Sequence, residues 1–470
     1  MQENTDRQFQ RDIESCGQRA ETESQGYDQA SGLRVITETG NTNNEPVKTN
    51  DLLEAIIDRK NLNEACRRVV ANGGAGGVDA MTVHELPKWL EENYDALQTR
   101  LRAGKYKPSP VQRVEIPKPE KGATRKLGIP TVVDRMIQQA IVQVLTPLYE
   151  PLFSDNSFGF RPDRGCHDAL YKVQEIANRG NVWVASLDLE KFFDTVNHSK
   201  LIQLVSNTVK DGRVVSLIHR FLYAGVMENG IKVASRKGTP QGGPLSPLLA
   251  NILLNELDQE LSKRGHEFVR YADDVLILKK TQKAATRTLE SVSAFIEKKL
   301  FLKVNKDKSY VARITNPKVK YLGYGFYASK GIQFRVHQKS FERLKDKIRF
   351  ILARSNGWSL EGRKESLKHL VRGWVNYFKL ASMRILLKET DEWLRRKIRC
   401  VYWKQWKRVR TKYKALMRLG ISRDQAYQWA NSRKAYWRIA GSPVLSRALN
   451  NNKLKEFGWT MLSSQYLQVH

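Results

Sequence analysis

Two adjacent aspartates between short apolar segments constrain the fold more than any other feature of this chain. Phe268-Val269 leads towards Tyr271-Ala272-Asp273-Asp274, and Val275-Leu276-Ile277-Leu278 follows. Two apolar segments joined by a short polar break predict a β-hairpin with both carboxylates at its turn. Aspartate is also a common turn residue without chemical function, so the pair alone leaves a structural interpretation open. In the catalytic interpretation the carboxylates hold magnesium, because hard cations prefer oxygen ligands.

Another aspartate ends a second apolar segment. Val182-Trp183-Val184-Ala185-Ser186-Leu187 is predicted to form a strand, and Asp188 follows it directly. If this strand lies beside the hairpin, Asp188 and Asp273 face the same metal ions and three carboxylates converge. Such a group is typical of two-metal sites, in which a hydroxyl attacks a phosphorus atom in line with the leaving group.

The rest of the chain predicts a mixed α+β fold. Helical signals begin at Asp51, a plausible N-cap, and end towards Asn72-Gly73-Gly74. Residues 110 to 129 alternate between apolar and polar around a basic tip, which indicates a hairpin. Ser246-Pro247 is typical of an N-cap followed by proline at the first helical position, and an apolar helix face follows. From about residue 338 onward the pattern is helical.

Charge and aromatic residues are concentrated in the last third of the chain. The 470 residues predict two or three domains and carry a net charge of +31. Residues 331 to 470 hold 32 Lys and Arg against nine Asp and Glu, together with eight of the ten tryptophans. Cations interleaved with aromatic rings are typical of nucleic-acid surfaces, whereas solvated helix faces and core tryptophans are the structural alternative.

Other functional classes find little support in the sequence. No apolar run approaches the length of a membrane span, and the N-terminus lacks the pattern of a secretory signal. Residues 1 to 48 are polar, and we predict a disordered leader there. The four cysteines are far apart without a C-x-x-C pair, which indicates a reducing cytoplasm and argues against a zinc module. They are Cys16, Cys66, Cys166 and Cys400.

Seven motifs in order, from about residue 50 to the end of the chain, resemble the reverse transcriptases encoded by bacterial group II introns, which are also called maturases. They are Ile116-Pro117-Lys118 with Arg125, Ile129-Pro130-Thr131 and Asp134-Arg135; Phe158-Gly159-Phe160-Arg161-Pro162; Asp188 to Asp194; Pro240 to Asn251; Tyr271 to Asp274; Lys303 to Lys308; and Tyr321-Leu322-Gly323. The resemblance implies a right-hand polymerase with fingers and palm in residues 49–335.

The same resemblance implies roles for individual residues. Asp188, Asp273 and Asp274 match the catalytic aspartates, with Asp188 and Asp273 binding two Mg²⁺ ions and Asp274 supporting the site. Phe193 matches the ring that excludes a ribose 2′-hydroxyl, so the enzyme is expected to prefer deoxynucleotides.

Contacts with the incoming deoxynucleoside triphosphate (dNTP) are implied for four further residues. Lys118 and Arg125 match residues that grip the triphosphate, and a guanidinium suits bidentate contacts with phosphate. Gln241 would line the nascent base pair. Lys308 resembles a late palm lysine near the phosphates, although a solvated surface lysine is an equal alternative.

The resemblance continues into the basic third of the chain. Residues 336–415 resemble the helical thumb, or X domain, and residues 416–470 resemble a basic DNA-binding region. Many relatives also carry an HNH endonuclease rich in cysteine and histidine, but only Cys400 lies in this third, so the chain is most similar to class C proteins without that domain.

The resemblance implies a bacterial, cytoplasmic RNA-directed DNA polymerase that is also a group II intron maturase. Its expected partners are intron RNA, an RNA template, a DNA primer or target and dNTPs, with no membrane. Two alternatives stay open at this point. One is a stand-alone reverse transcriptase in defence or DNA repair, and the other is a splicing factor with decayed polymerase activity.

Overall fold

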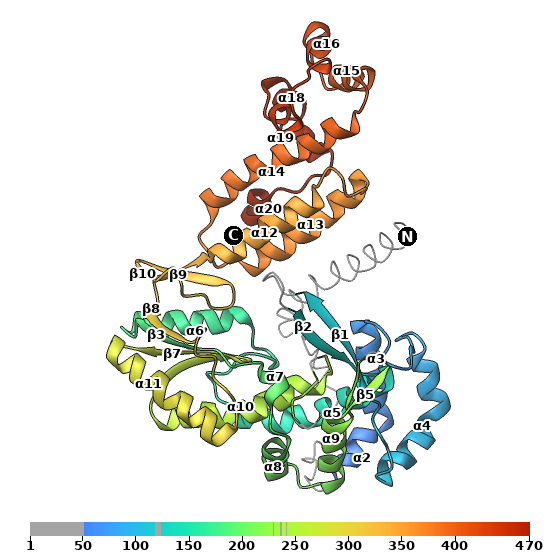
Figure 1. Ribbon diagram of the computed structural model, residues 1–470, viewed down its shortest axis with the longest axis vertical. Helices are drawn as coiled ribbons and strands as arrows, with labels where there is room; N and C mark the ends of the chain where they lie inside the picture. The colour runs from blue at the N-terminus through green and yellow to red at the C-terminus, as the bar shows by residue number, and fades with distance from the viewer. Residues whose placement is uncertain (1–50, 118–123, 229, 236, 241) are drawn as a thin grey trace, which may run out of the picture. The chain divides into compact units, whose positions relative to one another are not determined.

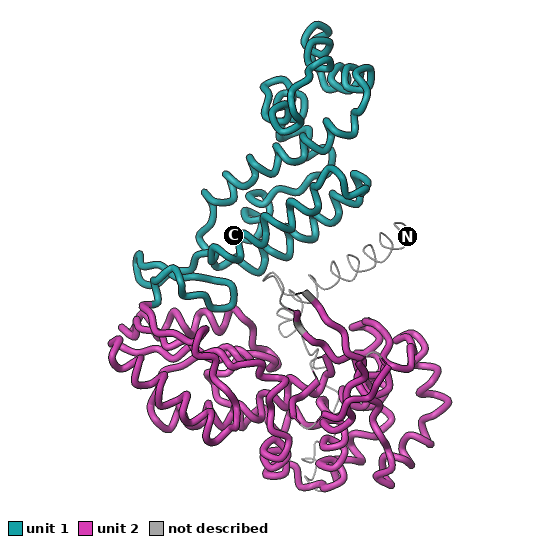
Figure 2. Tube along the Cα trace, viewed as in Figure 1, with its two compact units in different colours: residues 1–29, 314–470 teal, residues 30–313 magenta. Residues whose placement is uncertain are grey.

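The computed structural model describes two compact units, shown in Figure 2. Among the described residues, unit 2 contains those from 51 to 313 and unit 1 those from 314 to 470. The described ranges are 51–117, 124–228, 230–235, 237–240 and 242–470, with only the backbone described at Pro117 and Arg125. The predicted leader, residues 1–48, lies outside them. The predicted α+β class is confirmed (Figure 1).

The central sheet of unit 2 has four antiparallel strands in the order β6-β7-β3-β8. Its strands are β3 (Trp183–Leu187), β6 (Glu267–Tyr271), β7 (Asp274–Lys279) and β8 (Tyr310–Arg313). Val275 to Leu278 are buried because helices pack against the sheet. The strand before Asp188 and the hairpin around the paired aspartates are therefore both confirmed.

A second sheet of unit 2 has the order β2-β1-β4-β5. Its strands are β1 (Val111–Pro117), β2 (Thr124–Ile129), β4 (Val226–Glu228) and β5 (Ile231–Val233). Strand β1 pairs antiparallel with β2 and parallel with β4. The hairpin predicted over residues 110 to 129 is confirmed, and its tip, residues 118–123, lies outside the described residues.

Helices pack against the sheets of unit 2. They are α2 (Leu52–Ile57), α3 (Arg59–Asn72), α4 (Leu86–Arg102), α5 (Val132–Tyr149), α6 (Cys166–Asn178), α7 (Phe192–Thr195), α8 (His198–Thr208), α9 (Gly212–Tyr223), α10 (Leu245–Lys263) and α11 (Gln282–Phe295), with the single turns η1 (Glu150–Leu152) and η2 (Ile296–Leu300). All of them except α6 and η1 contribute to one large hydrophobic core. Helices α6, α10 and α11 pack against the central sheet.

Two helix starts differ from the prediction. Asp51 makes no capping hydrogen bond, and the helical segment breaks at Asp58, whose carboxylate caps α3 by accepting from Lys60 N (2.8 Å). Helix α10 begins at Leu245, so Ser246 is not its N-cap. The Ser246 hydroxyl donates instead to Pro240 O (2.7 Å), which ties the preceding loop to the helix.

Unit 1 consists of a two-stranded hairpin and helices, as predicted from about residue 338 onward. Its strands are β9 (Tyr324–Ser329) and β10 (Gly331–Val336). Its helices are α12 (Gln338–Ile351), α13 (Leu360–Tyr377), α14 (Arg384–Gln405), α15 (Val409–Arg418), α16 (Arg423–Ala430), α17 (Tyr436–Ala440), α18 (Pro443–Ala448), α19 (Asn451–Glu456) and α20 (Leu462–Gln468). Helix α20 packs against α13 and α14 (Figure 1). Across the described part of the chain, no helix is both long and apolar enough to cross a membrane.

Candidate active site

The paired strands bring the three predicted aspartates to one end of the central sheet. Leu187 of β3 pairs with Val275 of β7, and Tyr271 pairs with Asp274, so Ala272-Asp273 is the hairpin turn. One further step in the β3–β7 register sets Asp188 opposite Asp274, and opposite residues of antiparallel strands share a face. Asp188 and Asp273 are partly buried, whereas Asp274 is exposed. Asp188 thus reaches the hairpin, as the sequence predicted.

A fully buried ion pair supports the turn. The Arg270 guanidinium donates from Nε to both Asp258 oxygens (2.8 and 3.0 Å), and neither side chain is exposed to solvent. Its Nη1 also donates to Ala272 O (2.9 Å) and to Asn251 Oδ1 (2.9 Å). The first residue of the turn, with a φ of +54°, is therefore held from inside the protein. We did not predict this pair, although an arginine within an apolar strand was a usable signal.

The loop that follows Asn156 closes over the same turn. Phe158 N donates to Arg270 O (2.9 Å), and Asn251 Nδ2 donates to Gly159 O (2.9 Å). A Cβ atom at Gly159 would lie 2.3 Å from Ala272 N, which is closer than any real contact. Glycine at this position therefore lets the loop pack directly on the backbone of the turn.

Asp188 is held from the other side by the turn that carries Lys308. Asp188 N donates to Ser309 Oγ (3.1 Å), and Asn305 N donates to Asp188 O (2.9 Å). Asn305 Oδ1 accepts from Lys308 N (3.2 Å), while the lysine side chain is exposed. The structure therefore places an exposed cation on a turn attached to the backbone of the first aspartate.

Phe193 lies in the short helix α7, next to Phe192. The two rings are 5.0 Å apart and inclined at 72°, and Phe193 is partly buried against the hydrophobic core. Its carbonyl oxygen accepts from Thr239 N (2.7 Å), which connects it to the loop before α10. That loop contains Gln241, which lies outside the described residues, as does Lys118.

The glycine-rich loop before α10 packs closely on β2 and α5. A Cβ at Gly242 would lie 2.5 Å from Gly128 O in β2, the strand that also contains Arg125. A Cβ at Gly243 would lie 2.3 Å from Gln138 Oε1 in α5. The backbone contact requires glycine at position 242, whereas a Cβ at position 243 would meet only the end of the Gln138 side chain. The Gly242 contact joins two of the motifs predicted to bind the nucleotide.

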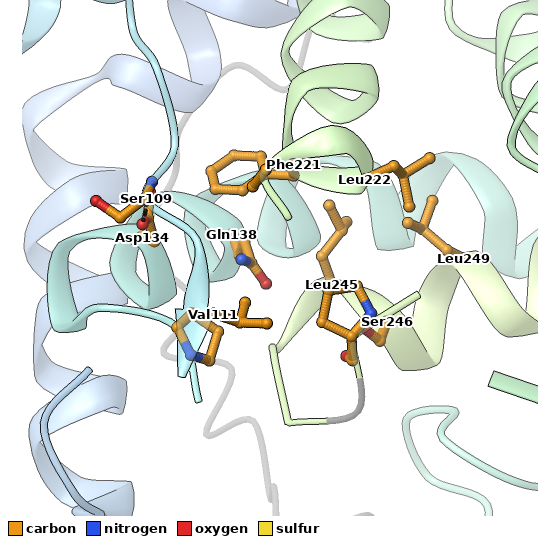
Figure 3. Close-up of a pocket in the computed structure, with 12 residues that line it drawn as sticks. Ser109, Val111, Asp134, Gln138, Phe221, Leu222, Leu245, Ser246 and Leu249 are labelled. Atoms are coloured by element: carbon orange, nitrogen blue, oxygen red, sulfur yellow. Dashed lines mark hydrogen bonds between the residues drawn. The ribbon is translucent and has the colours of Figure 1, made fainter. Parts of the chain in front are cut away.

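A small cavity lies beneath this loop, between β1, α5, α9 and α10 (Figure 3). Its wall includes Asp134, which accepts hydrogen bonds from the Tyr106 hydroxyl (2.7 Å) and from Ser109 N (3.0 Å). Burial raises the pKa of Asp134, and the hydrogen bonds oppose this shift. Gln138 of α5 and Pro240 of the loop line the same cavity. The cavity is therefore part of the interface between the loop and α5.

Comparison with known proteins decides the family. Residues 116–326 match the reverse transcriptase (RNA-dependent DNA polymerase) family, and residues 341–420 match the group II intron maturase-specific domain. The chain is 33% identical over 305 residues to protein YkfC of Escherichia coli K12, covering 56% of this chain and 80% of YkfC. The chain belongs to the group II intron-encoded reverse transcriptase/maturase family.

A second relative carries the family description in its name. The group II intron-encoded protein LtrA of Lactococcus lactis subsp. cremoris is 32% identical over 298 residues, covering 50% of this chain and 49% of LtrA. The chain thus spans about half the length of that relative. Among solved structures, telomerase from Candida albicans aligns over 80% of this chain and 68% of its own, with a TM-score of 0.39 and 14% identity.

Carboxylates are the oxygen ligands that Mg²⁺ prefers, and family members are generally Mg²⁺-dependent. Among the residues that the structure describes, no three Asp, Glu, His or Cys side chains are grouped so as to hold a metal by themselves. Magnesium sites commonly use one or two carboxylates, with water and substrate phosphates as the other ligands. Asp188 and the hairpin aspartates at this end of the sheet are ligands of the type that such an open site uses.

Unit 1 carries cations above aromatic rings. Arg396 Cζ lies 4.1 Å from the Trp437 ring centre, and Arg354 Cζ lies 4.7 Å from that of Tyr436. Trp437 itself is 40% exposed. Further cations above rings of the same region are Arg349 and Lys397 over Trp393, Lys404 over Tyr436, and Lys412 over Trp403. Positive charge and exposed ring area occur together at Trp437, a combination that is typical of nucleic-acid-binding surfaces.

Proposed function

We propose that this chain is an RNA-directed DNA polymerase and a group II intron maturase. It binds its intron RNA, assists splicing, and copies the RNA into DNA during retrohoming. The observation that carries the polymerase proposal is the register that sets Asp188 opposite Asp274 with Asp273 at the turn. A maturase-specific domain in the same chain favours this function over a stand-alone reverse transcriptase.

The proposed reaction is attack of a primer 3′-hydroxyl on the α-phosphate of a dNTP. Two Mg²⁺ ions, when bound, would lower the pKa of that hydroxyl and neutralise charge on the leaving pyrophosphate. Asp188 and Asp273 would hold the ions, and Asp274 would support them. The Arg270–Asp258 pair fixes the turn so that the carboxylates need little reorganisation in each cycle.

Substrate contacts are proposed for the residues around this centre. Lys118, Arg125 and Lys308 would bind the triphosphate, because cations offset its charge. Gln241 would contact the nascent base pair. The ring of Phe193 would exclude a ribose 2′-hydroxyl by steric contact, which makes the enzyme selective for deoxynucleotides.

The basic third of the chain would bind the RNA and DNA partners. We propose that residues 336–415 form the thumb, or X domain, and that residues 416–470 contact DNA. The excess of 32 basic over nine acidic residues in the range 331–470 favours a polyanionic partner. Binding should therefore weaken steeply as salt rises, because neutralising phosphates releases counterions.

Primer extension on an RNA template with Mg²⁺ and dNTPs tests the polymerase proposal. Wild-type protein should extend the primer, and Asp273→Ala should lose extension while retaining its fold. Asp95→Ala is the matched control, since Asp95 is an exposed aspartate of α4 away from the central sheet. No extension by folded, RNA-binding wild-type protein would contradict the enzyme proposal and leave a splicing factor as the better account.

A splicing assay tests the maturase proposal separately. The intron RNA supplies the chemistry of splicing, so the protein acts by binding and needs no carboxylates for this step. Asp273→Ala should therefore assist splicing as the wild type does, with the same steep salt dependence. Loss of splicing assistance in a folded Asp273→Ala protein would contradict this division of labour.

A further inference from the structure

The segment Gly238-Thr239 is fastened to the turn that carries Phe193. Gly238 N donates to Val196 O (2.8 Å), and Thr239 N donates to Phe193 O (2.7 Å). Both residues of the segment are buried. The backbone of Phe193 is therefore held by a neighbouring loop segment as well as by its own short helix.

His198, the first residue of α8, holds this segment from another direction. Its Nε2 lies 2.6 Å from Gly238 O, and because a carbonyl oxygen can only accept, Nε2 carries the proton and donates. The imidazole is 2% exposed, and its ring meets Tyr223 edge-on at 4.8 Å. Burial lowers the pKa of His198, so the ring is neutral at neutral pH and keeps this donor.

Gly238 fits between His198 and the Phe193 turn only because it lacks a side chain. Its φ is +88°, a conformation that other residues rarely adopt. A Cβ at this position would lie 2.7 Å from Phe193 O and 2.9 Å from Asp194 O. The two carbonyls and the imidazole thus leave no room for a side chain at Gly238.

We propose that His198 is a positioning residue for sugar selection. By holding Gly238 against the Phe193 turn, it keeps the Phe193 ring where it meets the 2′ position of an incoming nucleotide. Without this donor, Gly238 O is buried and unpaired, so the segment shifts to satisfy it and the backbone anchor of Phe193 loosens. This inference rests on the proposed polymerase function and assigns a residue outside its motifs.

The test compares three variants in primer extension with dNTPs and with ribonucleoside triphosphates. His198→Phe keeps a ring beside Tyr223 but removes the donor, whereas His198→Gln restores an N–H near the Nε2 position. His219→Phe is the matched control, because His219 stacks on the same Tyr223 ring (4.3 Å) and is exposed. The readout is the ratio of kcat/KM for the deoxy- and ribonucleotide, which a general loss of stability does not change.

His198→Phe should lower this ratio on the order of tenfold, the factor expected for one buried hydrogen bond. His198→Gln should recover most of the discrimination, and His219→Phe should match the wild type. Unchanged discrimination in folded, active His198→Phe would overturn the proposal, as would a His198→Gln protein as permissive as His198→Phe. If His198→Phe does not fold, Gly238→Ala tests the same contact and should also lower the ratio.

A second readout separates this inference from the proposed function. Amide hydrogen exchange at Gly238 and Thr239 should accelerate in His198→Phe and not in His219→Phe, whether or not the protein polymerises. Wild-type protein without extension would sink the polymerase proposal alone. Unchanged exchange in His198→Phe would sink the role of His198 even in a fully active enzyme.

Discussion

Removing one charge of the Arg270–Asp258 pair should destabilise the protein strongly. Asp258→Asn keeps the shape of the side chain but leaves the Arg270 guanidinium buried without a counterion. Breaking a fully buried ion pair in this way costs about 3–5 kcal/mol of unfolding free energy. At roughly 2 °C per kcal/mol for a unit of this size, the melting temperature should fall by about 6–10 °C.

Two controls make this prediction specific to burial. Asp155→Asn removes the same charge from the Arg164 pair, but the Asp155 side chain is 94% exposed, so the cost should be at most about 1 kcal/mol. The double variant Asp258→Leu/Arg270→Met removes both buried charges, so it should be more stable than Asp258→Asn alone. Thermal melts at one fixed scan rate would measure all three.

Activity gives a second, independent readout of the same pair. The double variant still lacks the Arg270 donor to Ala272 O, so it should recover stability without recovering full primer extension. The reasoning is refuted if Asp258→Asn melts like Asp155→Asn, or if the double variant is no more stable than the single one. Full activity in the double variant would show that Arg270 does not hold the turn.

Three further predictions concern other contacts. Gly159→Ala should lower primer extension by about 10–100-fold and destabilise the protein by about 1–3 kcal/mol, because its Cβ displaces the turn backbone at Ala272; wild-type activity would contradict this. Burial, aided by nearby Lys320, lowers the pKa of His337, so the unfolded chain binds a proton more readily than the folded one. The free energy of unfolding should therefore fall as the pH drops below about 6.5. In His337→Asn, which keeps a capping side chain on α12, denaturation should show that this free energy depends less on pH. Asp391→Ala removes the acceptor of two backbone N–H groups at the start of α20, so it should cost about 2–4 kcal/mol and speed hydrogen exchange in that helix; unchanged exchange would refute the contact.

The local elements of the site could be predicted because they depend on short-range patterns. Apolar segments ending at Asp188 and flanking Asp273 predict strands and a turn, since the alternation of burial along a strand is a property of neighbouring residues. The corrected helix starts show the limit of such patterns. Ser246 is a favourable N-cap by type, yet the helix begins at Leu245, two residues earlier than predicted, and the Ser246 hydroxyl donates to the Pro240 carbonyl from within its first turn.

The contacts that support the site could not be predicted in the same way. Arg270 and Asp258 lie on different elements, and nothing in their spacing shows that one charge neutralises the other. The same holds for His198 and Gly238, which meet only because α8 and the loop before α10 are folded together. Such contacts depend on tertiary packing, because each buried polar group takes whichever partner the fold brings within reach.

The sequence by itself determined the residue types on which the proposed chemistry rests: an aspartate after a strand, two more at a hairpin turn, an aromatic residue after the first of them, and a basic region rich in tryptophan. Only the tertiary structure decided that β3 pairs with β7, which sets Asp188 opposite the hairpin, and that Arg270 holds the turn. The physical reason is the separation along the chain over which each kind of interaction acts. Residue type and alternation act between neighbours, whereas strand order, register and buried charge pairing join segments that are distant in the chain.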